Sequence, residues 1–185
     1  SIFSEFKAEG SVQDVVAYGK GHINDTFLVI TQDAHKPNYI LQRINHDIFQ
    51  HIPEMMDNIR IVTEHLQQEK VHGPEKESNE QCLHLIETND NNSFTQDQDG
   101  NYWRWLNFIE NAIIYEKASN PEIAQQAGKI IGKFQSALAN LDQKLFETLP
   151  KFHNFNRRHD EYLKAIATNY GNRSERVKGE LEFVD

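Results

Sequence analysis

The stretch AYGKGHINDTFLVI, residues 17–30, decides how the rest of the chain is interpreted. Gly19 and Gly21 flank Lys20, and a polar run separates them from an alternating apolar segment that is typical of a strand. Glycines let a backbone approach an anion closely, and amide groups in a turn can donate hydrogen bonds to it. The stretch therefore predicts either an ordinary hairpin turn or a backbone cradle for phosphate groups.

The spacing differs from that of a P-loop, which needs a glycine where Asp14 stands and a serine or threonine where Gly21 stands. A cradle built here would bind phosphate through main-chain amides, one lysine charge and short polar side chains. The candidate residues are Gly19, Lys20, Gly21, His22, Asn24 and Thr26.

Strand-like segments surround this stretch on both sides. Residues 12–19, 22–32 and 39–45 are rich in β-branched and aromatic residues and are joined by short polar connections, which predicts an antiparallel meander. A short helix over 2–9 precedes them. A helix over 51–70 follows, and its apolar stripe at helical spacing consists of Ile52, Met55, Ile59, Val62 and Leu66.

Two more strands are predicted at 82–88 and 101–110, with a polar loop between them, and only helices follow. These helices cover 119–141, capped by Ser119 or Asn120, then 155–171 and 174–185. Strands followed by helices indicate an α+β fold. Five antiparallel strands with one helix after the third form the plan of a protein-kinase-like small lobe, so the later helices would begin a helical lobe.

This plan predicts a nucleotide-binding lobe over residues 1–110 and, over 111–185, a hinge with the first helices of an incomplete second lobe. In kinases a lysine on the third strand pairs with a glutamate on the next helix. Here Gln42 takes the lysine position, and we expect it to form a neutral amide pair with Asn58, unless Asn58 only satisfies nearby backbone groups. Lys20, Arg43 or a metal ion would then supply the positive charge.

The last predicted strand, YWRWLNFIEN, leads from aromatic residues into a polar segment. In the kinase plan this segment is the hinge that meets adenine, and its edge consists of Asn107, Phe108, Ile109 and Glu110. The alternative is a plain central strand. Trp103 and Trp105 alternate onto one face of the strand, where core packing is favoured over sugar stacking.

Composition excludes several classes of function. The chain has 185 residues, of which 38% are apolar and 25% charged, which is enough for a core. A net charge of −9 argues against nucleic-acid binding, which needs a basic surface. Cys82 is the single cysteine and is expected in the core. The sequence contains no membrane-length apolar run and no signal peptide, which predicts a cytoplasmic protein that does not bind membranes.

The segments YGKGHINDTFLV, YILQRIN and WR…FIE resemble the aminoglycoside phosphotransferase and choline kinase-like superfamily. They look most like its N-acetylhexosamine 1-kinase-type sugar kinases, from Phe3 to about residue 170. The resemblance implies transfer of the γ-phosphoryl group of ATP, with Mg²⁺, to a hydroxyl group of a small molecule such as an N-acetylhexosamine. Choline, an aminoglycoside or homoserine are alternative acceptors, and a non-catalytic interaction domain with a kinase-like lobe is a further alternative.

Such kinases also carry a His-x-Asp-x-x-x-x-Asn loop and metal ligands in the second lobe, and these are expected beyond Asp185. The nearest segment, RRHDEYLKAIATN, has His159 and Asp160 adjacent and reads as an amphipathic helix. We therefore expect no catalytic or metal-binding residue in this chain, which alone would bind nucleotide without turnover. Apolar surface left uncovered by the rest of the second lobe would favour self-association.

No other metal site is expected. None of the nine histidines has the spacing of a zinc-binding helix. The acidic loop lacks the glycine and final glutamate of a calcium loop, so it is predicted to be a solvated turn. Its carboxylates are Asp90, Asp97 and Asp99.

Overall fold

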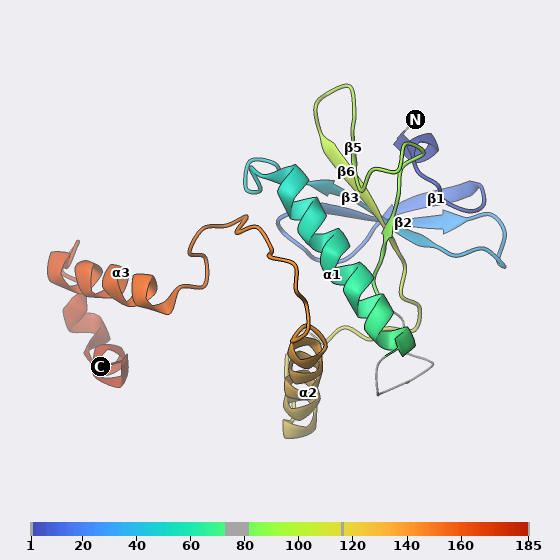
Figure 1. The fold of residues 1–185 in the computed structure, drawn as a ribbon. Helices are drawn as coiled ribbons and strands as arrows, with labels where there is room; N and C mark the ends of the chain where they lie inside the picture. The colour runs from blue at the N-terminus through green and yellow to red at the C-terminus, as the bar shows by residue number, and fades with distance from the viewer. Residues whose placement is uncertain (1, 73–81, 116, 185) are drawn as a thin grey trace. The chain divides into compact units, whose positions relative to one another are not determined.

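The computed structural model describes residues 2–72, 82–115 and 117–184, which form two compact units, residues 1–148 and 149–185 (Figure 1). The first unit contains an antiparallel sheet, helix α1 and helix α2, so the predicted α+β small lobe followed by helices is confirmed. The predicted boundary at residue 110 separates a nucleotide-binding lobe from a helical lobe. The two compact units do not test this boundary, so it stays a prediction.

Six strands form the sheet in the order β1-β2-β3-β6-β4, with β5 pairing separately with β6. All the pairings are antiparallel. The bounds are β1 Val12–Ala17, β2 Asp25–Thr31, β3 Tyr39–Ile44, β4 Leu85–Ile86, β5 Thr95–Gln96 and β6 Tyr102–Asn107. The first three strands and β6 match the predicted segments, with shorter ends.

The strand predicted over 82–88 is only two residues long in the structure. The residues just before it form hydrogen bonds with the Asn107 side chain instead of with a neighbouring strand. The His84 N–H donates to Asn107 Oδ1 over 2.8 Å, and Asn107 Nδ2 donates to the Cys82 carbonyl over 3.0 Å. A side-chain amide thus satisfies groups that would otherwise need a strand partner. The two-residue strand β5 was not expected, because it lies inside the polar loop 89–101.

One face of the sheet carries an aromatic core beneath the N-terminal segment. A 3₁₀ helix, Ile2–Glu5, leads to Phe6, whose ring stacks on Trp105 with centroids 5.3 Å apart. Tyr39 stacks on the same indole at 5.2 Å. Trp105 is only 1% exposed and Trp103 packs against this cluster, so the predicted core role of both tryptophans is confirmed.

Helix α1, Ile52–His72, covers part of the opposite face, as Figure 1 shows. Its core contacts repeat every three to four residues, which is the spacing that places side chains on one side of a helix. The buried cluster comprises Ile44, Ile52, Met55 and Met56, with Ile59 packed against it.

Helix α2, Pro121–Ala137, begins as predicted, because Asn120 Oδ1 accepts from the Ile123 N–H over 2.9 Å. Its apolar side chains are largely uncovered: Ile130, Ile131 and Phe134 are 67%, 59% and 48% exposed. The self-association expected from uncovered apolar surface stays a prediction, and these residues are the ones to replace in testing it.

The second unit contains α3, Phe155–Thr168, a 3₁₀ turn at Ser174–Val177 and α4, Lys178–Val184. Asn154 caps α3, and Asn169 ends it in the left-handed conformation with φ 41°. His159 and Asp160 lie within α3, so the predicted assignment of this segment to a helix rather than a catalytic loop is confirmed.

Candidate functional site

The connection between β1 and β2 contains two glycines with different structural needs. Gly19 has φ +80°, a conformation that favours glycine. Gly21 has no positive φ of this kind, and a Cβ added there would meet no atom within 4 Å among the described residues. The backbone conformation therefore explains the glycine at position 19. At position 21 neither the backbone conformation nor the neighbouring atoms require a glycine.

This connection is mostly exposed, and some of its backbone N–H groups have no acceptor among the described residues. Tyr18 N–H donates to the Thr26 carbonyl over 2.9 Å and closes the strand pair. Within the described part of the chain, the N–H groups of Gly19, Gly21 and His22 donate to no acceptor. Asn24 differs, because its Oδ1 accepts from the Asn45 N–H over 3.0 Å and is used to end β3.

Cross-strand register builds an apolar row on the α1 face of the sheet. Val16 pairs with Leu28, Leu28 with Ile40, and Ile40 with Leu106. Directly opposed residues in antiparallel strands point to the same face. Leu106 is buried whereas Val16 is 38% exposed, so the row opens toward the β1 edge. The row offers a flat apolar surface next to the glycine-bearing connection.

A polar row lies two residues further along the same face, at the end nearer the glycines. Thr26 pairs with Gln42, and Gln42 with Arg104. Gln42 Nε2 donates to Thr26 Oγ1 over 2.9 Å, while Arg104 Nε and Nη2 donate to Gln42 Oε1 over 3.0 and 2.8 Å. Thr26 and Gln42 are thus two predicted site residues that the structure brings into direct contact.

Arg104 is the cation of this row, and it is not among the site residues predicted from the sequence. Burial lowers the pKa of Arg104 to about 10, because desolvation disfavours the charged guanidinium. Arg43 lies on the other face, where its Nε donates to Asp25 Oδ2 over 2.7 Å, so it adds no charge to the row.

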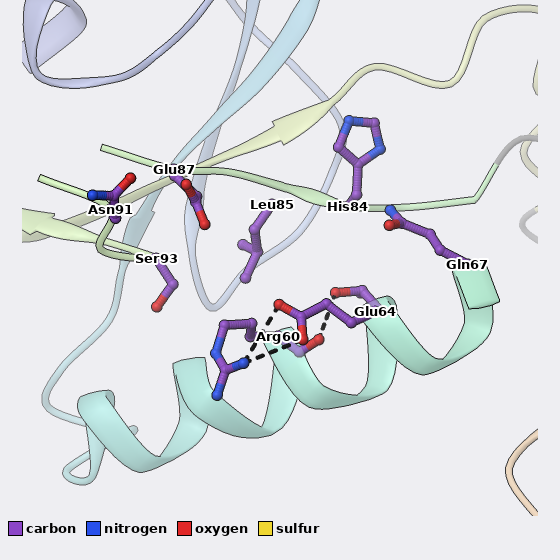
Figure 2. A pocket seen from close by; sticks show the side chains of 9 residues that line it. Arg60, Glu64, Gln67, His84, Leu85, Glu87, Asn91 and Ser93 are labelled. Carbon is purple, nitrogen blue, oxygen red and sulfur yellow. Dashed lines mark hydrogen bonds and ion pairs between the residues drawn. The ribbon is translucent and has the colours of Figure 1, made fainter. Parts of the chain in front are cut away.

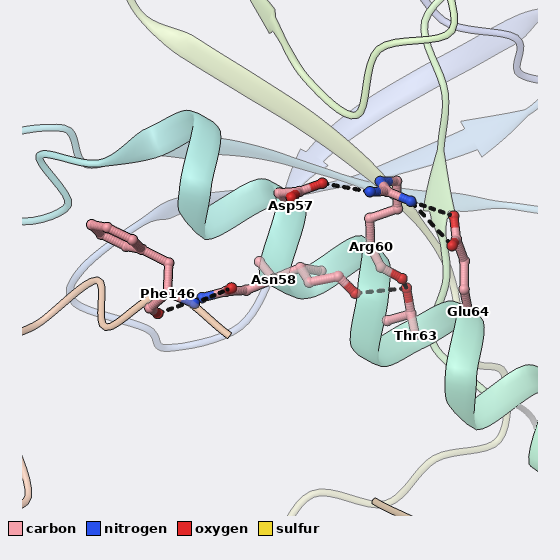
Figure 3. Close-up of polar contacts among 7 residues, drawn as sticks. Asp57, Asn58, Arg60, Thr63, Glu64 and Phe146 are labelled. Atoms are coloured by element: carbon pink, nitrogen blue, oxygen red, sulfur yellow. Dashed lines mark hydrogen bonds and ion pairs between the residues drawn. The ribbon is translucent and has the colours of Figure 1, made fainter. Parts of the chain in front are cut away.

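The predicted pair between Gln42 and Asn58 is wrong. Asn58 Nδ2 donates to the Phe146 carbonyl over 2.8 Å, and its Oδ1 accepts from the Phe146 N–H over 2.9 Å (Figure 3). Met56 contacts the polar row instead, with its sulfur 3.7 Å from Arg104 Nη1. Two residues advance a helix by about 200°, so Asn58 cannot share the sheet-facing side with Met56.

The predicted hinge begins with Asn107, the last residue of β6, and continues beyond the strand. Asn107 N–H donates to the His84 carbonyl and Phe108 N–H to the Asn38 carbonyl, each over 3.2 Å, so both amides are already used. The Phe108 ring meets Tyr18 edge to face, with centroids 5.6 Å apart. Tyr18 immediately precedes Gly19, so this contact links the glycine-bearing connection to the predicted hinge.

The pockets among the described residues include one beside α1 and one near the predicted hinge. One of about 220 Å³ lies between α1 and β4 and includes Arg60, Glu64 and His84 (Figure 2). Strand β4 is at the opposite end of the sheet order from β1, so this pocket is separate from the glycine-bearing connection. The other, of about 330 Å³, is lined in part by Ile30 and Glu110 and borders the predicted hinge.

Neither a metal cluster nor a membrane span is found in the described ranges. No group of three or more His, Cys, Asp or Glu side chains there could hold a metal ion. No helix of the described residues combines the length and apolar character needed to cross a bilayer.

A comparison with known protein families places the chain in one of them. The model of APH, described as the phosphotransferase enzyme family, matches residues 14–184 and so spans both units from β1 to α4. Members of this kind transfer a phosphoryl group to a small molecule. The chain belongs to the phosphotransferase enzyme family.

Proposed function

We propose that the chain carries the nucleotide-binding part of an ATP-dependent kinase that phosphorylates a hydroxyl group of a small molecule. The observation that carries this proposal is Gly21, whose lack of a side chain has no cause in the fold. One reason for a glycine that the backbone does not require is close approach of a ligand, and Gly21 lies in a strand connection rather than inside a helix. When bound, ATP supplies the phosphoryl group and Mg²⁺ neutralises part of its charge.

The glycine-bearing connection would hold the phosphates. The N–H groups of Gly19, Gly21 and His22 are available as donors, and Lys20 adds a positive charge in the same segment. Amides gathered in a turn bind anions well because several donors converge on one group. Asn24 is less suited to this role than we expected, since its carbonyl oxygen is occupied by the Asn45 N–H.

The apolar row would hold the base. Val16, Leu28 and Ile40 form a surface that is only partly buried, and a flat heterocycle can pack on such a surface. The N–H groups of Asn107 and Phe108 already donate to backbone carbonyls. We therefore propose that the backbone of Ile109 and Glu110 forms the hydrogen bonds with the edge of the base.

For the acceptor we propose an N-acetylhexosamine or a related sugar, with choline, an aminoglycoside or homoserine as alternatives. The support for the sugar acceptor is the resemblance of the sequence motifs, and the cytoplasmic location stays a separate prediction. A panel of these acceptors, assayed for acceptor-dependent ATP consumption in a protein that includes this chain, would rank them. A non-catalytic interaction domain would instead leave the amides from Gly19 to Thr26 unchanged in an NMR titration with ATP and Mg²⁺.

The test of the proposal is Gly21→Ala. We expect about tenfold weaker ATP binding by calorimetry, equivalent to about 1.4 kcal/mol, because the new methyl group occupies the space the phosphates approach. Stability should be unchanged or rise by up to about 1 kcal/mol. Gly128→Ala in α2 is the matched control, because its Cβ position is equally open. Equal ATP binding by the two variants and the unchanged protein would contradict the proposal.

A further inference from the structure

Arg104 is a partly buried cation without an anion. Its guanidinium donates to Gln42 Oε1 and lies against the Met56 sulfur. No carboxylate among the described residues forms an ion pair with it. Withdrawing a charge from water costs free energy that a neutral amide offsets only in part. A fold that keeps this residue without a counter-ion leaves room for an external anion.

The surroundings of Arg104 supply no such counter-ion from helix α1 or strand β3. Met56, at 0% exposure, occupies the place on α1 from which a carboxylate could reach the guanidinium. Gln42 is the opposed residue on β3 and is neutral. The positive charge on this face therefore stands on β6, one strand away from the position where kinases carry their lysine.

The polar row connects this charge to the glycine-bearing connection. Gln42 contacts both Arg104 and Thr26, and the Thr26 carbonyl accepts from the N–H of Tyr18, the residue before Gly19. Arginine has five N–H donors, and only some of them are used by Gln42 and Met56. The remaining donors can bind a phosphate oxygen while the contact with Gln42 is kept.

We propose that Arg104 binds the phosphate groups of the nucleotide and replaces, from the neighbouring strand, the lysine that Gln42 displaces on β3. This inference rests on the proposed nucleotide site and adds the residue that supplies its charge. A charged hydrogen bond to phosphate contributes more to binding than a neutral one. Removal of Arg104 should therefore weaken phosphate-bearing ligands and spare the base.

The experiment compares ATP, ADP and adenosine by calorimetry on Arg104→Met and Arg104→Lys. Arg104→Met should bind ATP at least about tenfold more weakly and adenosine unchanged, since a contact with phosphate alone is lost. Arg104→Lys should recover part of the ATP affinity. Arg43→Met is the matched control, because Arg43 lies on the adjacent strand but faces away and pairs with Asp25.

The outcomes separate this inference from the proposed function. Unchanged protein that binds neither ATP nor adenosine would overturn both. ATP binding that Arg104→Met retains, or an equal loss of ATP and adenosine, would overturn the role of Arg104 and leave the nucleotide site standing. If Arg104→Met does not fold, the ¹⁵Nε resonance of Arg104 in the unchanged protein decides: it should shift with ATP and not with adenosine, and no shift with ATP refutes the contact.

Discussion

The two faces of the sheet are built from the same strands but are closed in different ways. On one face Phe6 and Tyr39 stack on Trp105, and the N-terminal segment seals them from water. On the other face α1 covers only part of the surface, and the apolar and polar rows next to it stay partly open. The difference teaches that one face is fully closed by packing, whereas the face with the proposed nucleotide site keeps partly exposed side chains beside its α1 core.

Strand β6 makes the contrast plainest, because neighbouring residues serve different faces. Trp105 is buried in the aromatic core, while Arg104 belongs to the polar row. Alternation in a strand sends successive side chains to opposite faces. Mutations one residue apart should therefore separate loss of the fold from loss of binding.

The largest effect is expected from Trp105→Ala. Removing a fully buried indole should cost about 3–5 kcal/mol, a large part of the roughly 5–15 kcal/mol by which an ordinary domain is stable. Trp105→Phe should cost much less, because Trp105 Nε1 has no hydrogen-bond partner among the described residues. Thermal denaturation by circular dichroism measures both. A mild effect of the alanine variant would show that the aromatic face does not carry the stability of the unit.

A second effect, of opposite sign on stability and binding, is expected from Gln42→Glu. A carboxylate opposite Arg104 supplies the missing counter-ion, so stability should rise by about 1 kcal/mol while ATP binding weakens about tenfold. Gln42→Met is the control: it leaves the guanidinium without its acceptor and should cost about 1–3 kcal/mol. Denaturant unfolding and calorimetry measure the two effects. If Gln42→Glu were less stable than the unchanged protein, Arg104 would not need a counter-ion in the polar row.

The smallest effect is expected at the loop before β6. Hydrogen bonds lower the pKa of Asp97 from 3.8 to about 2, chiefly the one from Trp103 Nε1 over 2.7 Å and then those from Asn101. Because the pKa is lower in the folded state, the stabilisation is fully present above the unfolded value of 3.8 and is lost as the pH falls toward 2.

The melting temperatures of the unchanged protein and Asp97→Asn, followed between pH 6 and pH 2, should accordingly converge at the acid end. Asp99→Asn, in the same loop, is the control and should track the unchanged protein throughout. A difference between Asp97→Asn and the unchanged protein that does not vary with pH would assign the effect to packing rather than to the carboxylate charge.

The sequence was sufficient for features that depend on local pattern. The cap at Asn120, the alternation of Trp103 and Trp105, and three members of the α1 stripe, Ile52, Met55 and Ile59, follow from periodicity or from one side chain and its neighbours. The order of strands and helices was then enough to identify the small lobe. The family match agrees with the motifs quoted from the same segments.

Predictions that depend on contacts between distant parts of the chain were wrong for Asn58 and missing for Arg104. The error at Asn58 came from choosing the wrong edge of the α1 stripe, because the direction of a helix face relative to the sheet is set by packing. Arg104 carried a local signal, since it stands between two core tryptophans and must face the other way. Its contact with Gln42 depends on the register of β3 and β6, which residues in one strand do not determine.

The charge of Arg104 also fixes the direction of every hydrogen bond in the polar row. A guanidinium can only donate, so it must meet the oxygen of the Gln42 amide, and the amide nitrogen is left to donate to Thr26 Oγ1. Among the described residues the Thr26 hydroxyl proton has no acceptor, so it is available to water or to a ligand. Thr26→Ser would preserve this polarity and Thr26→Val would end it, so one fixed charge sets the direction of hydrogen bonds across three strands.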